Sequence, residues 1–449
     1  MAGLIDAGMD VARMNFSHGT QADHEAVYQM VREASEAAGK PVAILADMQG
    51  PKIRLGTFED GAVQWNAGDR VSITSEDVEG TRERVSCTYK KLPAEVSKGD
   101  RLLVDDGKLS LEVLSSSDTD VECLVVEGGP VSDHKGLSLP NVAISVPALS
   151  EKDISDMKFA LNLGVDLIAM SFVRHPDDVR LGHRVMDEVG VRRPIIAKVE
   201  KPEAVARLEE IVRAFDGVMV ARGDLGVEMP LDEVPIVQKE IVRLCRDNAK
   251  PVIVATQMLD SMIENARPTR AEVSDVANAV LDGADAVMLS GETSVGKYPV
   301  GAVRTMAKIV QTTESGPVEP REMRHEPRTK PGAITAAAAQ IADALGAKAL
   351  AAFTQTGDTV KRLARLKPSQ PIIGMTSIES VRNQMALSWG TDAYLVEHVD
   401  HTDAMFVLVD KTMQEHGLAA PGDLVVIVAG TPAGTPGSTN TVRVHQIGS

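Results

Sequence analysis

The chain has 449 residues, more than one compact hydrophobic core usually holds, so we expect two or three domains. A composition of 43% hydrophobic and 25% charged residues excludes a disordered or fibrous protein. The formal net charge of −17 argues against nucleic acid and anionic membrane surfaces as partners, and no apolar run is long enough to span a bilayer. The three cysteines have neither metal-binding nor disulfide spacing. We therefore expect a soluble, cytoplasmic protein.

A repeated unit organises the first 310 residues: a short apolar run, then polar residues, then a helical pattern. It occurs seven times, with apolar runs at 11–16, 42–46, 166–172, 195–199, 218–221, 252–255 and 286–289. Apolar runs that alternate with helices are typical of a parallel sheet covered on both faces. Ser150 with Asp153, and Thr269 with Glu272, form capping boxes that predict two helix starts. Because polar residues gather where the runs end, we predict an α/β fold, a (β/α)8 TIM barrel of which seven strands are found.

The pattern predicts that the catalytic barrel comprises residues 1–56 and 138–313. Between 57 and 137, short alternating strands with Gly-Asp turns predict a small inserted all-β domain, a β-barrel that could act as a lid. The charged, proline-containing stretch 314–331 predicts a linker. Residues 332–449 predict a C-terminal open α/β regulatory domain. Its expected elements are a helix at 335–345 and strands at 348–353, 371–375 and 423–428.

Charged residues inside or beside these apolar runs are the main candidates for chemistry. Lys198 and Glu200 stand two apart on one strand, so their side chains point to the same face. Asp224 follows the next run, where it could share Mg²⁺ with Glu200. A structural ion pair explains Lys198 and Glu200 equally well when they are taken alone. Gly223 permits close backbone approach, and the N–H groups of the following turn could hold a carboxylate or phosphate; a plain Gly-Asp turn is the alternative.

Three further residues are candidates for substrate contact. Thr256 ends a strand and could contact a substrate, although such a threonine more often caps a helix. Arg13 and Arg54 are candidate phosphate clamps, because a guanidinium fork matches phosphate oxygens. Single arginines more often lie on solvated surfaces, but Arg13 is embedded in an apolar run.

Hydroxyl groups gather at one point of the C-terminal domain. Thr354, Thr356 and Thr359 surround Gly357 between a predicted strand and helix. They could form a phosphate cradle, and a simple capping turn is about as good an explanation.

Seven segments, taken together and in order, resemble pyruvate kinase. They are GMDVARMNFSHG at 8–19, AKVE at 197–200, VARGDLGVE at 220–228, ATQML at 255–259, RPTRAE at 267–272, SDVANAVLDGAD at 274–285 and MLSGET at 288–293. The similarity extends from Ala2 to the C-terminal end and is strongest in the barrel. It implies transfer of the phosphoryl group of phosphoenolpyruvate to ADP, giving pyruvate and ATP as in the last step of glycolysis.

The resemblance also implies roles for single residues. Lys198 and Arg13 would contact the transferring phosphoryl group, and Glu200 and Asp224 would bind Mg²⁺, with Mn²⁺ possible. Gly223, Asp224 and Thr256 would surround the substrate carboxylate and the reacting carbon. The implied nucleotide contacts are Asn15, Phe16, Ser17, His18, Arg54 and Lys135. A phosphorylated allosteric effector would bind at Thr354, Thr356, Gly357 and Thr359 of a homotetramer.

One departure from the family concerns K⁺. In the family a Glu after the second strand accompanies a bound K⁺, whose ligands match Asn15, Ser17, Asp47 and the backbone of Met48. The corresponding residue here is Lys52. We expect its ammonium to replace the ion, because two cations so close would repel each other, so that K⁺ is not required. A surface lysine is the alternative.

A second departure concerns the barrel. Family members carry a strand ending in Thr-x-Gly-Pro before the helix with which this sequence opens, which accounts for the count of seven. Without that strand the barrel would have unpaired edges, and we expect reduced stability or activity unless the natural protein begins further upstream.

Two other functions remain open. An enolate-forming lyase or mutase could use the same carboxylates and cation, and ADP-dependent pyruvate release would separate it from a kinase. An inactive regulatory protein could bind a sugar phosphate through the hydroxyls near Gly357. The presence of Lys198, Glu200, Asp224 and Thr256 together favours an enzyme.

Overall fold

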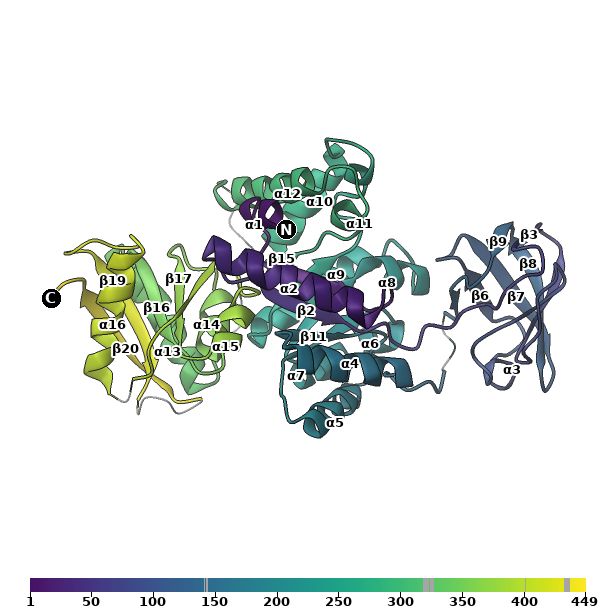
Figure 1. The fold of residues 1–449 in the computed structure, drawn as a ribbon, viewed down its shortest axis with the longest axis horizontal. Helices are drawn as coiled ribbons and strands as arrows, with labels where there is room; N and C mark the ends of the chain where they lie inside the picture. Colours follow the sequence, from purple (N-terminus) through teal and green to yellow (C-terminus); the bar gives the residue numbers. More distant parts are fainter. Residues whose placement is uncertain (141, 143, 318–322, 324–326, 400, 432–436) are drawn as a thin grey trace.

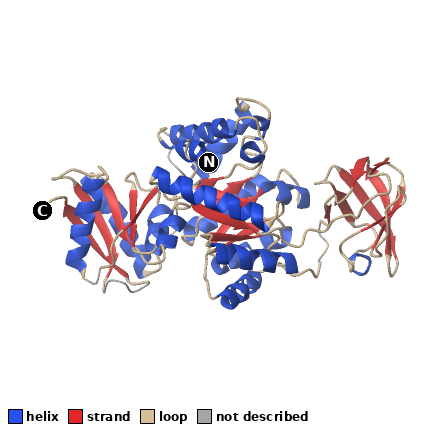
Figure 2. Ribbon diagram, in the orientation of Figure 1, coloured by secondary structure: helices blue, strands red, loops and turns tan. Residues whose placement is uncertain are grey.

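The computed structural model describes residues 1–449 except 141, 143, 318–322, 324–326, 400 and 432–436. Its elements form three bodies in a row: a C-terminal α/β domain, a central sheet surrounded by helices, and a small β domain (Figure 1). Helices cover the central and C-terminal sheets, whereas the small domain is almost entirely strand and loop (Figure 2). None of the described helices is long and apolar enough to cross a membrane.

The central sheet has seven parallel strands in the order β1-β2-β11-β12-β13-β14-β15. Their bounds are β1 Val11–Asn15, β2 Ala43–Asp47, β11 Leu167–Met170, β12 Ile195–Val199, β13 Gly217–Ala221, β14 Val252–Ala255 and β15 Ala286–Val287. Each overlaps one predicted run, which confirms the seven predicted strands. The run at 166–172 is longer than β11 because Phe172 turns to a φ of 54° and leaves the strand. Among the described residues no strand joins β15 to β1, so the sheet is open there.

Helices surround the outer face of this sheet. They are α1 Ala2–Asp6, α2 Gln21–Ala38, α4 Glu151–Leu163, α5 Val179–Val189, α6 Pro202–Ala206, α7 Leu208–Ala214, α8 Arg222–Glu228, α9 Val234–Asp247, α10 Arg270–Asp282, α11 Gly291–Ser294 and α12 Pro299–Glu314, with 3-10 turns at Pro176–Asp178 and Asp260–Ile263. Both predicted capping boxes, at the starts of α4 and α10, are confirmed.

The two faces of the central sheet bury separate hydrophobic clusters. Ile195, Ala197 and Val199 of β12 pack in the cluster that includes the surrounding helices. Ile196 belongs to the inner cluster, together with Leu387 from the C-terminal domain. Because side chains alternate along a strand, Lys198 lies on the same inner face as Ile196. The sheet thus turns this lysine toward the interior that a barrel would enclose.

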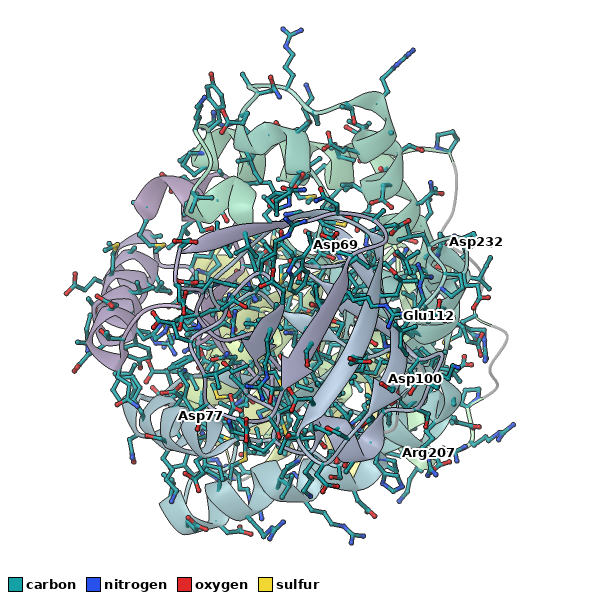
Figure 3. All side chains as sticks on the ribbon, turned by 90° about the vertical axis from the view of Figure 1, so that its right-hand side faces the viewer. Asp69, Asp77, Asp100, Glu112, Arg207 and Asp232 are labelled. Atoms are coloured by element: carbon teal, nitrogen blue, oxygen red, sulfur yellow. The ribbon has the colours of Figure 1, made fainter. Side chains whose placement is uncertain are left out.

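The small β domain is inserted between β2 and α4. Its elements are β3 Ala62–Trp65, β4 Arg70–Thr74, β5 Arg84–Ser86, α3 Leu92–Glu95, β6 Arg101–Val104, β7 Leu109–Ser116, β8 Asp120–Glu127, β9 Gly129–Ser132 and β10 Leu137–Ser138. They form a six-stranded sheet, β10-β6-β7-β8-β4-β5, and the pair β3-β9. Figure 3 views the molecule from this side, and the labelled Asp69, Asp77, Asp100 and Glu112 belong to this domain. Since the chain enters it after β2, the domain lies beyond the C-terminal ends of the central strands.

The C-terminal domain has a five-stranded sheet in the order β18-β17-β16-β19-β20. Its elements are α13 Lys330–Leu345, β16 Ala349–Phe353, α14 Asp358–Ala364, β17 Ile372–Thr376, α15 Glu379–Met385, β18 Thr391–Leu395, α16 Thr402–Glu415, β19 Leu424–Gly430 and β20 Thr439–Gln446. The predicted helix and three strands are present, whereas the two edge strands β18 and β20 were not predicted. Residues 318–322 and 324–326 of the predicted linker lie outside the described residues, whereas Glu314 still belongs to α12 and α13 already begins at Lys330.

The C-terminal domain packs against the N-terminal ends of the central strands. The Gln384 amide donates to the carbonyl of Asp166, which precedes β11. The Trp389 amide donates to the carboxylate of Asp285, which precedes β15. The C-terminal edge of the sheet is therefore left to the small β domain, on the opposite side (Figure 1).

Candidate active site

Lys198 is the centre of a buried charge cluster at the C-terminal end of β12. Its Nζ lies 2.9 Å from Glu200 Oε1 and 3.2 Å from Asp47 Oδ1, and donates a 2.6 Å hydrogen bond to Ser171 Oγ. Burial opposes its charge, but Asp47 and Glu200 outweigh that effect and raise the pKa of Lys198 above its ordinary value. The lysine is only 9% exposed and remains a fixed positive charge.

Asp47 connects this lysine to a second cation. Its Oδ2 accepts a 2.7 Å hydrogen bond from Arg13 Nε, while its Oδ1 faces Lys198. Asp47 is buried, whereas the Arg13 side chain keeps 23% of its surface exposed. From β2, the carboxylate thus fixes one cation on the adjacent strand β1 and another on β12, an arrangement suited to binding an anion with several oxygens.

Glu200 and Asp224 are the predicted metal ligands. Burial raises the pKa of Glu200 to about 7; the charge of Lys198 lowers it and the charge of Asp224 raises it. Glu200 directly follows β12 and Asp224 lies in the first turn of α8 after the neighbouring strand β13. The part of the chain that the structure describes has no group of three or more His, Cys, Asp or Glu residues that could hold a metal. Two carboxylates, with water and substrate oxygens, are nevertheless the ligand set that Mg²⁺ favours, so the residues fit that ion.

Thr256 lies in a strained turn after β14. Its φ is 69° and that of Gln257 is 52°, a left-handed conformation that is rare for a β-branched residue. Thr256 Oγ1 accepts a 2.7 Å hydrogen bond from the amide of Gly223 and donates to the carbonyl of Ala255. Thr256 is not the N-cap of a helix in its own segment; its hydroxyl instead accepts from an amide in the first turn of α8. The Gly223 amide, predicted as a possible substrate donor, is already bonded to this hydroxyl.

The predicted nucleotide residues fall into two groups. Asn15 ends β1 and residues 16–18 form the turn after it, where Asn15 Oδ1 accepts from the Ser17 amide. Phe16 is 1% exposed and stacks on His24, so only its backbone can reach a ligand. Its carbonyl is held by Lys152 Nζ at 2.8 Å.

The second group lies where the β domain joins the sheet. Arg54 Nη1 donates to the carbonyl of His134 at 3.0 Å, and Lys135 Nζ lies 2.9 Å from Asp105 Oδ1. Both side chains are thus paired within the β domain and its connection. A nucleotide phosphate would have to compete with these partners.

Lys52 lies in a pocket between the β domain and the central sheet. The pocket is partly open to solvent, and its wall also includes Asp106, Phe172 and Asp224. The Lys52 Nζ lies 3.7 Å from Asp106 Oδ1. Within the described residues, no hydrogen bond or ion pair joins Lys52 to the predicted K⁺ ligands Asn15, Ser17, Asp47 and Met48. Lys52 therefore shares a pocket with Asp224, the predicted Mg²⁺ ligand, and does not bond to the predicted K⁺ ligands.

The hydroxyl cluster of the C-terminal domain also lines a pocket, of about 610 Å³ and partly open. Thr354, Thr356 and Thr359 belong to its wall, as do Ser438 and Thr439. Thr354 Oγ1 accepts from the Gly357 amide at 2.9 Å, and the hydroxyls of Thr359 and Thr439 are 2.8 Å apart. The Thr354 hydroxyl thus closes a turn onto the N-cap residue Gly357 without capping α14 itself, and the predicted effector residues share one partly open hollow.

Sequence reasoning missed two residues of the central site. Ser171 Oγ donates to the carbonyl of Met48 at 2.7 Å and accepts from Lys198, so it joins β2, β11 and β12. The Phe172 amide donates to Glu200 Oε2 at 2.7 Å. The position of Ser171 directly after a buried strand was the only sequence signal for either.

Comparison with known proteins identifies the family. The pyruvate kinase barrel domain matches residues 1–303, and the pyruvate kinase alpha/beta domain matches residues 332–445. The chain belongs to the pyruvate kinase family. Pyruvate kinases from Mycobacterium intracellulare and Mycobacterium tuberculosis are 62% and 60% identical over 445 residues, which is 99% of this chain and 94% of each relative.

A solved structure extends the similarity to the fold. A crystal structure of a pyruvate kinase from Cryptosporidium parvum is 35% identical, with a TM-score of 0.91 over 99% of this chain and 92% of that one. This agreement supports the predicted barrel-type α/β fold with two further domains. Membership of the pyruvate kinase family also favours a phosphotransferase over the lyase, mutase and inactive alternatives.

Proposed function

We propose that this protein transfers the phosphoryl group of phosphoenolpyruvate to ADP, giving pyruvate and ATP. In this reaction the bond between phosphorus and the enol oxygen breaks and a bond to the terminal ADP oxygen forms. The enolate that remains takes up a proton at its methylene carbon. The observation that supports this best is the buried Lys198 ammonium, held by Asp47 and Glu200 beside Arg13. Phosphoryl transfer depends mainly on positioning and charge stabilisation, which two fixed cations supply.

Each residue of the site has a proposed task. Lys198 stabilises charge on the transferring phosphoryl group and on the enolate oxygen, and Arg13 binds phosphate oxygens through the donors that Asp47 leaves free. Glu200 and Asp224 would hold Mg²⁺, or Mn²⁺, which supplies Lewis-acid polarisation of substrate oxygens when bound. Thr256, with Gly223, borders the substrate carboxylate and the carbon that becomes a methyl group.

Nucleotide binding is proposed for residues at the ends of β1 and at the β domain. Asn15, Phe16, Ser17 and His18 follow one strand end, with Phe16 acting through its backbone. Arg54 and Lys135 belong to the connection with the β domain, which we propose acts as a lid. Exchange of their present partners, His134 and Asp105, for phosphate oxygens would couple nucleotide binding to lid movement.

We also propose that K⁺ is not required, because Lys52 supplies a positive charge near the metal site. Its place in the same pocket wall as Asp224 supports this. The pocket around Thr354, Thr356 and Thr359, with Gly357 at the start of α14, is the proposed site for a phosphorylated effector. A homotetrameric assembly and a cytoplasmic location complete the proposal.

The proposed function is tested by measuring pyruvate formation from phosphoenolpyruvate and Mg²⁺ with and without ADP. Pyruvate that appears only with ADP, in equal amount to ATP, is the expected result. Product formation without ADP would instead identify an enolate-forming lyase or mutase. No product in either condition, from folded protein, would indicate the regulatory alternative.

A further inference from the structure

Arg222 connects four elements immediately behind the proposed substrate site. Its Nε donates to the carbonyl of Ala255 at 3.2 Å, and its Nη2 donates to the carbonyl of Thr256 at 2.6 Å. Its Nη1 lies 2.8 and 2.7 Å from the two carboxylate oxygens of Asp275 on α10, and 3.4 Å from the Gln238 side chain on α9. The guanidinium of this first residue of α8 is thus bonded to the end of β14 and to the helices α9 and α10.

The backbone that Arg222 holds is strained. Thr256 and Gln257 both have positive φ values, 69° and 52°. For residues other than glycine such a conformation costs on the order of 1–3 kcal/mol and persists only where surrounding contacts enforce it. Arg222 contacts this segment at three points, the carbonyls of Ala255 and Thr256 and the sulfur of Met258, so it is placed to enforce the conformation. Because the guanidinium is planar and rigid, it can serve two carbonyls and a carboxylate at once.

The same strained turn fixes the position of the Thr256 hydroxyl. Thr256 Oγ1 accepts from the Gly223 amide at 2.7 Å, and a Cβ added at Gly223 would lie 3.4 Å from this oxygen. Gly223 precedes the metal ligand Asp224. The hydroxyl therefore stays beside the metal site only while the turn keeps its left-handed shape.

We infer that Arg222 is a positioning residue for phosphoryl transfer, with Asp275 as its anchor. It acts by holding the Thr256–Gln257 turn, so that Thr256 stays against Gly223 and Asp224. This inference rests on the proposed function, in which Thr256 borders the substrate. Arg222 itself touches no reacting atom.

The first test compares kcat and KM for Arg222→Gln and Arg222→Lys with wild type. We expect kcat for pyruvate formation to fall about 10- to 100-fold in both variants, because a displacement near 1 Å can cost about 100-fold. The KM for ADP should stay within about twofold, because the proposed nucleotide contacts lie elsewhere. A lysine cannot reach all three acceptors, so wild-type kcat in Arg222→Lys would overturn the inference, as would wild-type kcat in Arg222→Gln.

A double-mutant cycle separates positioning from a general structural role. If Arg222 acts through Thr256, the variant carrying both Arg222→Gln and Thr256→Ala should lose no more activity than Thr256→Ala alone. Additive losses would contradict the inference. Arg213→Gln, which removes an exposed ion pair with Glu209 on α7, is the matched control and should match wild type. If Arg222→Gln does not fold, Asp275→Asn is measured in its place. The inference predicts that its kcat falls about three- to tenfold, and an unchanged kcat would contradict it.

A crystal structure of Arg222→Gln supplies a readout that does not depend on activity. We expect φ of Thr256 to leave the left-handed region or its hydroxyl to separate from the Gly223 amide. An unchanged turn would overturn the inference even if kcat of the variant has fallen. A wild-type enzyme that makes no pyruvate would instead count against the proposed function, while the geometry of the turn still tests the role of Arg222.

Discussion

The Lys198 ammonium lies 2.9 Å from the Glu200 carboxylate, and both residues are buried at the end of one strand. Burying two charges is costly, and a hydrophobic pair in their place would often be as stable. The pair is placed where β12 meets β13, beside Asp224. We therefore regard it as a feature retained for catalysis, and it leads to the first two predictions.

Replacement of Lys198 by Met should abolish most of the activity. We expect kcat for pyruvate formation to fall about 1000-fold, since the loss of one donor to a developing negative charge costs about 100- to 1000-fold in comparable sites and this donor is fully charged. The variant should also melt at a lower temperature, because Asp47 and Glu200 lose their shared cation. Lys158→Met, which breaks an exposed pair with Glu188, is the control and should retain both properties. Activity near wild type in Lys198→Met would contradict the assignment.

Removal of either carboxylate should weaken metal binding directly. In Glu200→Gln and Asp224→Asn we expect the Kd for Mn²⁺, measured by titration calorimetry on the protein without substrate, to rise at least about tenfold. Even residues that only hydrogen-bond to a metal ligand change metal affinity about 10- to 100-fold when they are mutated, so loss of a ligand itself should cost at least as much. Glu188→Gln, on the surface, should leave the Kd unchanged. Wild-type affinity in both site variants would place the metal elsewhere.

The dependence on monovalent cations tests Lys52. Wild-type activity should be nearly the same in K⁺ and in tetramethylammonium buffers. Lys52→Glu should need K⁺, with an activity ratio of at least about ten between the buffers, because the carboxylate adds negative charge where the ammonium stood. Collapse of wild-type activity without K⁺ would show that Lys52 does not replace the ion.

A pH-dependent stability is expected at the contact between the C-terminal domain and the central sheet. Lys367 Nζ donates to the carbonyl of Ala284 at 2.9 Å and lies 4.6 Å from the centre of the Trp389 ring. Burial lowers the pKa of Lys367 from 10.5 to about 8, with Asp285 and Glu314 raising it and Arg246 lowering it. Between these two values the unfolded chain binds more protons, so this group makes stability rise as pH increases from about 8 to 10.5, and below about 8 its unfavourable contribution is constant.

Lys367→Met should remove this contribution. We expect the difference in melting temperature, variant minus wild type, to be larger at about pH 7 than at about pH 9. The reason is that only the wild type must bury a charged lysine at the lower pH. An equal difference at both pH values would show that Lys367 has an ordinary pKa. Lys158→Met again provides a surface control.

The sequence was most informative where charged residues occur within an otherwise apolar strand. Strands with two covered faces are apolar throughout, so the seven central strands could be found from composition alone. Lys198 and Glu200 were visible for the same reason, since charges in such runs are rare. The edge strands β18 and β20 carry mixed polar residues and gave no comparable signal.

Partners that come from distant segments could not be predicted. Nothing in the local sequence indicates that the Gly223 amide bonds to Thr256, or that Arg222 reaches Asp275, because these contacts depend on the strand order of the folded sheet. The salt bridge of Lys52 with Asp106 depends likewise on how the β domain sits against the sheet.

The most direct test of the account is phosphorus NMR of a single reaction that contains the wild-type protein, phosphoenolpyruvate, ADP and Mg²⁺. The account predicts that the phosphoenolpyruvate signal declines as the γ-phosphate signal of ATP rises by the same amount, with pyruvate formed in equal quantity. Conversion of phosphoenolpyruvate into another phosphorylated acid while the ADP signal stays constant would contradict it.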